Sequence, residues 1–106
     1  MSRDSITCMN SERDLLVPTE VSRDPKAVEV IRAWVANEGL VCALRPTTWA
    51  DSGAWGIVLA DAARHVANAL RDETGDDPAA TVVKIREMFN RELAEPTDEP
   101  TGAFIP

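Results

Sequence analysis

Apolar side chains recur at steps of three and four between residues 47 and 73. This spacing is that of one face of an α-helix turned towards a core. The residues that follow it are Trp55, Leu59, Ala62, Val66 and Leu70. Thr48 or Asp51 can cap the start, because either side-chain oxygen can accept a hydrogen bond from an unpaired N–H of the first turn, and Gly75 is typical of a helix end. The pattern predicts one long amphipathic helix around which the chain is organised.

Gly56 interrupts this otherwise alanine-rich segment. Glycine inside a helix costs about 1 kcal/mol relative to alanine. Either another element packs closely against the helix at Gly56, or this residue still belongs to the irregular turn that precedes the helix.

Two Asp-Pro pairs predict the starts of two further helices. Aspartate caps a helix, and proline is tolerated at the first helical position because its missing N–H would have no partner there. The first helix is expected over residues 24–37, before Gly39. The second is expected over residues 78–93, before Pro96.

Two short apolar runs, residues 15–17 and 40–44, predict strands. A strand-helix-strand unit implies a parallel pair with a right-handed crossover. The predicted fold is a small two-layer α+β sandwich, with two or three short strands and three helices, the longest central. A bare edge or face of such a sheet could be a dimer contact.

The chain divides into three predicted parts. Residues 1–13 are polar without a period and are expected to be a flexible N-terminal segment. Residues 14–95 form a single α+β domain, in keeping with a length of 106 residues. Residues 96–106 are an acidic, proline-punctuated tail whose apolar end either docks as a short strand or stays mobile.

Composition and charge narrow the class of protein. A hydrophobic fraction of 44% and a mean hydropathy of -0.18 are those of a globular chain. No apolar run approaches the roughly 20 residues of a membrane span, and acidic residues stand where a signal peptide would be apolar. We therefore expect a cytoplasmic protein. A net charge of -7 argues against binding to nucleic acid or to anionic membranes, which leaves a protein partner or a second copy.

Several segments resemble a small bacterial family of uncharacterised proteins, the domain of unknown function 5076. These segments are DPKAVEVIRAW, a short strand after it, WADSGAWGIVLADAARHVANA and IREMF. The resemblance covers roughly residues 24–99, and residues 49–65 are its most specific part. It implies a single small cytoplasmic domain and gives no activity, cofactor or catalytic residue.

His65, the single histidine of the chain, follows Asp61 by one helical turn. An aspartate in that position can orient the imidazole for general-base work or proton transfer, and a nearby Cys42 would complete a Cys-His-Asp nucleophile set. Alternatively, His65 makes a structural hydrogen bond and Asp61 pairs with Arg64.

Two separated cysteines, Cys8 and Cys42, are typical of free thiols in a chain without a secretion signal. Together with one histidine they do not provide the ligand spacing of structural zinc, and no glycine-rich phosphate loop is present. We expect neither a metal nor a cofactor.

Interface candidates are Trp49, Trp55 and Arg64. Large aromatic rings give much contact area for each side chain immobilised. A core position is favoured for Trp34 and Trp55, whereas Trp49 fits an interface and a core equally. Arg64 could meet an acidic partner or lie on a solvated helix face. The leading hypothesis is a non-enzymatic protein-interaction or regulatory module that self-associates. The alternative is a small enzyme or ligand binder that uses the Cys-His-Asp set.

Overall fold

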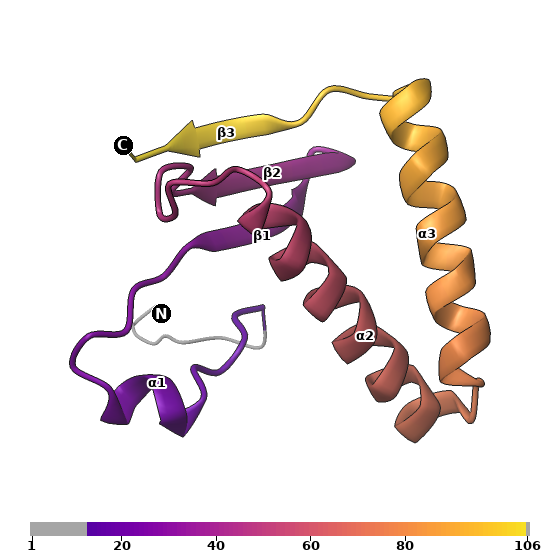
Figure 1. Cartoon of the computed structure of the whole chain (residues 1–106), viewed down its shortest axis with the longest axis horizontal. Helices are drawn as coiled ribbons and strands as arrows, with labels where there is room; N and C mark the ends of the chain where they lie inside the picture. Colours follow the sequence, from indigo (N-terminus) through magenta and orange to yellow (C-terminus); the bar gives the residue numbers. More distant parts are fainter. Residues whose placement is uncertain (1–12, 106) are drawn as a thin grey trace.

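The computed structural model describes residues 13–105, which form a small α+β fold of three helices and a three-stranded sheet (Figure 1). The elements, in chain order, are α1 (Thr19–Arg23), β1 (Ile31–Ala36), β2 (Gly39–Leu44), α2 (Ala54–Thr74), α3 (Pro78–Ala94) and β3 (Thr101–Phe104). This confirms the predicted fold class, with the longest helix in the centre of the chain. The predicted flexible segment lies, except for Arg13, outside the described residues. None of the described helices is long and apolar enough to cross a bilayer.

The helix predicted over residues 24–37 is wrong, because β1 and β2 form an antiparallel hairpin there. Asp24 does not cap a helix; its Oδ1 accepts a hydrogen bond from the N–H of Lys26, at 2.9 Å, which closes a local turn. The hairpin turn is made by Asn37 and Glu38, both with positive φ (53° and 63°), as a two-residue turn that matches strand twist requires.

The strand predicted over residues 15–17 is also wrong, because that segment pairs with no strand among residues 13–105 and leads into α1. The predicted strand-helix-strand unit is therefore wrong as well, because it depended on this strand. The third strand comes instead from the tail: β3 pairs parallel with β2, with Phe104 beside Leu44, so the open alternative for residues 96–106 resolves as a docked strand. The parallel crossover therefore runs from β2 through both long helices to β3.

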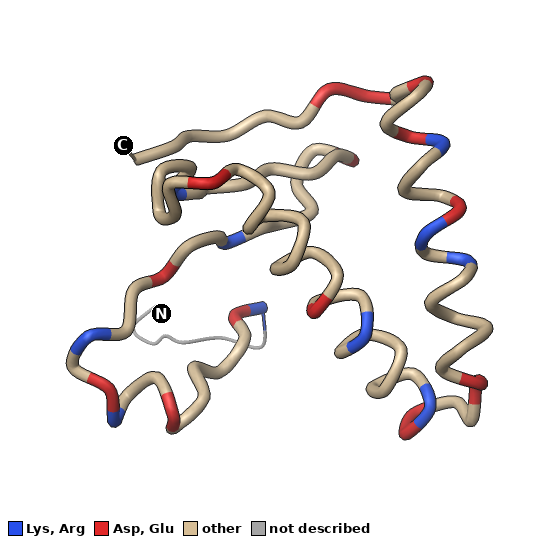
Figure 2. Tube along the Cα trace, viewed as in Figure 1, with Lys and Arg blue, Asp and Glu red and all other residues tan. Residues whose placement is uncertain are grey.

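Charge is distributed very unevenly between the two layers of the fold. Figure 2 shows acidic and basic residues along α2 and α3, whereas the three strands carry only Arg32. Strands without charge are typical of a sheet that is covered on at least one face.

The long central helix ends as predicted, with Gly75 in the left-handed conformation at φ 80°. Its start differs: no side chain caps the first turn, and Asp51 Oδ1 instead accepts from the N–H of Gly53, at 2.8 Å, just outside the helix. Gly56 lies in the first turn of α2, and, apart from its chain neighbours and the backbone of its own helix, no atom lies within 4 Å of the place its Cβ would take. Neither explanation offered for this glycine therefore holds.

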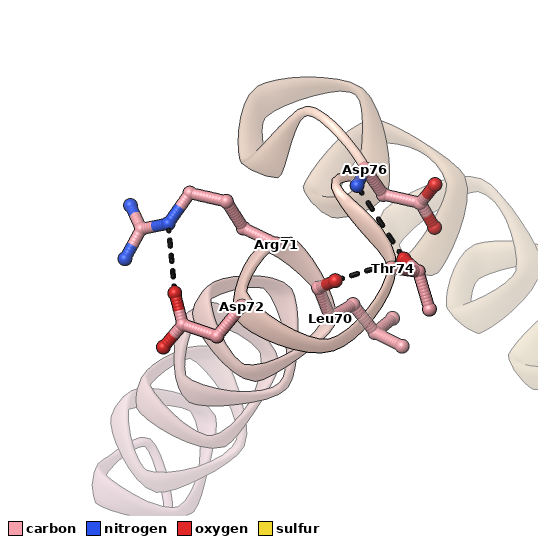
Figure 3. A network of polar contacts seen from close by, with 5 residues as sticks. All are labelled: Leu70, Arg71, Asp72, Thr74 and Asp76. Carbon is pink, nitrogen blue, oxygen red and sulfur yellow. Dashed lines mark hydrogen bonds and ion pairs between the residues drawn. The ribbon is translucent and has the colours of Figure 1, made fainter.

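A short turn reverses the chain between α2 and α3 (Figure 3). Thr74 Oγ1 donates to the carbonyl of Leu70 at 2.8 Å and accepts from the N–H of Asp76 at 3.4 Å. Asp77 then caps α3 as predicted, since its carboxylate accepts from the N–H of Ala80 at 3.1 Å, with Pro78 at the first helical position. The two helices form a hairpin.

Very little of this fold is buried. Ala67, at 1% exposure, is the single buried hydrophobic residue in the described part of the chain. The two long helices contact each other and the strands contact each other, but no Cα of a described helix lies within 8 Å of a Cα of the sheet. In Figure 1, α2 leads away from the sheet and α3 leads back to it. The helical layer and the sheet layer therefore lie apart within a single chain.

Candidate interaction site

Trp49 and Trp55 stack edge to face where the entry loop meets α2. Their ring centroids are 5.5 Å apart and the ring planes make an angle of 80°. Trp55 Nε1 donates to the carbonyl of Pro46 at 3.1 Å, which fixes the loop against the first turn of the helix. Trp49 is 39% exposed and Trp55 is half-buried. Together they form a rigid aromatic corner that is still open to solvent on the Trp49 side.

Arg64 is not part of this corner. The rise of an α-helix places it about 13 Å further along the axis than Trp55. Arg64 Nη2 donates to Asp61 Oδ1, and both side chains are well exposed. Exposed ion pairs of this kind contribute little to stability.

The proposed Cys42, Asp61 and His65 set is not assembled within the chain. Cys42 is a half-buried free thiol in the central strand, and no Cα of β2 lies within 8 Å of a Cα of α2, which carries the other two residues. Asp61 binds Arg64, as the alternative from the sequence expects, and His65 is exposed. In the described part of the chain, no group of three or more histidine, cysteine or carboxylate side chains could hold a metal.

A shallow hollow of about 260 Å³ lies beside β1 and the ends of β2 and β3. Arg32 and Arg45 both line it. Arg32 Nε donates to Glu29 at 2.7 Å, and its guanidinium lies 6.0 Å from the centre of the Trp34 ring. The hydrogen bond that Arg32 donates to Glu29, followed by the negative charge of Glu29, raises the pKa of Arg32. The cation and the carboxylate thus satisfy each other, and the hollow offers no free acid-base pair.

One face of the sheet is an uncharged hydrophobic surface, which we call the apolar sheet face. The strand register places its residues on the same side: Ile31, Ala33, Val35, Leu40, Cys42, Leu44 and Phe104. Val35 is 86% exposed, Leu40 51% and Phe104 71%. The opposite face carries Arg32 and Trp34. Sequence reasoning missed this surface because it assigned β1 to a helix, although the β-branched and aromatic residues Ile31, Trp34 and Val35 are of types enriched in strands and were a usable signal.

The second uncovered surface runs along α2, and we call it the α2 strip. It consists of Leu59, Ala62, Val66 and Ala69, spaced three and four residues apart and all exposed. On the neighbouring side of α2, Ala67 is buried and Ala63 and Leu70 are half-buried, as expected for the side that meets α3. The apolar stripe of this helix is thus wider than its partner helix covers.

Comparison with known proteins gives a family and a structural relative. The family profile of the domain of unknown function DUF5076 matches residues 14–97. A solved structure from the photosynthetic bacterium Rhodopseudomonas palustris, described as that of a "putative pyruvate dehydrogenase", is 34% identical with a TM-score of 0.67, and the match covers 88% of this chain and 95% of that one. No curated protein matches the chain. The chain therefore belongs to the DUF5076 family.

Proposed function

We propose that this chain is a non-enzymatic interaction module that works in a self-associated form. The observation that carries the proposal is its uncovered hydrophobic surface. The chain exposes 8776 Å², whereas a compact monomer of its mass exposes about 5,800 Å². Most of its large hydrophobic side chains contribute to this surplus, with Leu59 at 43% and Val66 at 47% exposure among them.

The surplus persists under the strictest allowance for residues 1–12 and 106. An unfolded segment of that length has at most about 2,100 Å² of surface. If this area is subtracted from the observed surface, and the mass of the segment is left out of the compact reference, a surplus of about 1,400 Å² remains. A stable protein-protein interface buries about 800 Å² per partner. A surplus of about 1,400 Å² on each copy exceeds that figure and matches the larger interfaces of obligate homodimers, which bury about 2,000–5,000 Å² in total.

Stability gives a second reason. A single β-hairpin or a short helical hairpin is marginal in water without a hydrophobic face to cover. Here no Cα of a described helix lies within 8 Å of a Cα of the sheet, so the two layers are not closely packed within the chain. Covering them from outside supplies the burial on which folding depends.

Protein is the class of partner that the surface fits. The uncovered patches are apolar and uncharged, and the chain carries a net charge of -7, so neither nucleic acid nor an anionic membrane is expected to bind. Trp49 offers a partly exposed aromatic anchor at the edge of α2. The Rhodopseudomonas relative contributes its fold to this proposal and not its described activity, because function has to be argued from a site. A cytoplasmic location stays a prediction.

Thermal unfolding over a hundredfold range of protein concentration tests the proposal. If the chain folds as an assembly, the Tm rises with concentration, because association stabilises only the folded state. A Tm that is the same at every concentration contradicts self-association.

A further inference from the structure

Among the residues that the structure describes, two apolar surfaces have no covering partner, and they belong to different layers. The α2 strip lies on the helical hairpin, and the apolar sheet face lies on the strands. No Cα of α2 comes within 8 Å of the strands, so the two surfaces do not cover each other in one chain. In α+β folds a helix stripe and a sheet face of this kind cover each other.

The two surfaces match in size and chemistry. From Leu59 to Ala69 the α2 strip is about 15 Å long, and a six-residue strand such as β1 is about 20 Å long. Alanines alternate with larger residues along the strip, which lets the helix lie close to the sheet. Neither surface carries a charge.

We propose that a second copy of this chain covers both surfaces reciprocally, with the α2 strip of each copy on the apolar sheet face of the other. This inference rests on the proposed function and names the surfaces through which it acts. A twofold pair of this kind is isologous and closes on itself. The two-layer sandwich that the sequence predicts is then completed between chains.

Two simpler dimer contacts would each cover only one of the two apolar surfaces. A strip-to-strip contact between two copies leaves the apolar sheet face bare, and a sheet-to-sheet contact leaves the strip bare. The reciprocal contact covers both. Two copies with a charge of -7 each also repel at long range, so their contact has to lie where charge is absent. Both surfaces meet this condition.

A charge-exchange experiment tests the arrangement on the full chain. Val35→Glu places an acid on the apolar sheet face, and Val66→Lys places a base on the α2 strip. Either variant alone buries a charge against an apolar surface, so we expect each dimer to weaken at least tenfold. An equimolar mixture should recover the dimer mass in light scattering, because glutamate then meets lysine at one contact while the other contact is unaltered.

Ile57→Lys is the matched control. Ile57 lies on α2 half a turn out of phase with Val66, on the opposite side of the helix, and is 64% exposed. This variant should keep the dimer. Circular dichroism on each variant separates loss of dimer from loss of fold, and recovery on mixing supports the contact even if a variant unfolds alone.

The other outcomes are distinguishable. If Val66→Lys dissociates the dimer and Val35→Glu does not, the contact is strip to strip and the reciprocal arrangement is overturned. It is also overturned if both variants dissociate without recovery on mixing, or if neither dissociates. In those cases self-association itself stands. A wild-type chain that is monomeric contradicts the proposed function and this inference together.

Discussion

Gly102 holds a backbone conformation that β3 needs and that other residues resist. Its φ is 137°, a region that glycine adopts and L side chains rarely do. A Cβ at this position would overlap the carbonyl oxygen of Cys42 in the neighbouring strand. The close parallel pairing of β3 with β2 therefore depends on this residue.

We predict that Gly102→Ala lowers the free energy of unfolding by about 1–3 kcal/mol, the usual cost of a strained backbone residue. Urea unfolding at fixed protein concentration measures it. Gly56→Ala is the control: space is open there and the residue is helical, so alanine should stabilise by about 0.5–1 kcal/mol. Equal stabilities for wild type and Gly102→Ala would contradict the assigned role.

Asp77 makes the capping hydrogen bond of α3. Asp77→Ala should therefore destabilise the chain by about 1 kcal/mol in the same unfolding experiment. Asp76→Ala keeps the change of charge but leaves the cap in place, and it should cost clearly less. If both substitutions cost the same, the effect is one of charge and not of capping.

At the scale of elements, α2 and α3 meet through small side chains. Ala67 is buried at their contact, with Ala63 and Leu70 half-buried beside it. Ile85 of α3 is half-buried, whereas Phe89 and Leu93 nearer its C-terminus are 45% and 70% exposed. The helix contact is thus closest near the turn that joins the two helices.

Ala67→Leu should force the two helices apart and cost about 1–3 kcal/mol, as overpacking does. Ala60→Leu on the same helix is the control, because Ala60 is exposed and surface substitutions usually stay within about 0.5 kcal/mol. Thermal unfolding of the two variants side by side compares them. A tolerated leucine at Ala67 would mean that this helix contact is loose.

The features that were predicted correctly from the sequence are those that depend on hydrogen bonds between neighbouring residues. The end of α2 at Gly75 and the start of α3 at Asp77 both follow from backbone hydrogen bonds within a few residues. Residues 24–37 could not be assigned in that way, because the partner that makes Ile31–Ala36 a strand is β2, formed by later residues. Pairing with a neighbouring strand outweighs a weak helix preference.

In the candidate site, too, the residue types were informative, whereas the contacts between distant segments could not be predicted. Trp49 and Trp55 were predicted as candidates from their residue type, and they lie together. A contact between Cys42 and His65 depends on tertiary structure, which the sequence pattern does not reveal. In the structure no Cα of the strand that carries Cys42 lies within 8 Å of a Cα of the helix that carries His65. The apolar sheet face could be recognised only once the strand register was known.

At the scale of the whole molecule, the chain is too open for its length. Its radius of gyration is 16.3 Å, against about 13 Å for a compact domain of this size. We propose a single explanation for the openness and for the exposed hydrophobic surface, which is that the folded unit contains more than one chain.

The molar mass in solution tests this claim most directly. We predict that light scattering coupled to gel filtration gives at least twice the chain mass of 11.5 kDa at micromolar concentration. The assembly should persist on dilution until the chain begins to unfold, since folding and association are coupled. A folded, cooperative monomer of 11.5 kDa at every concentration would contradict the account.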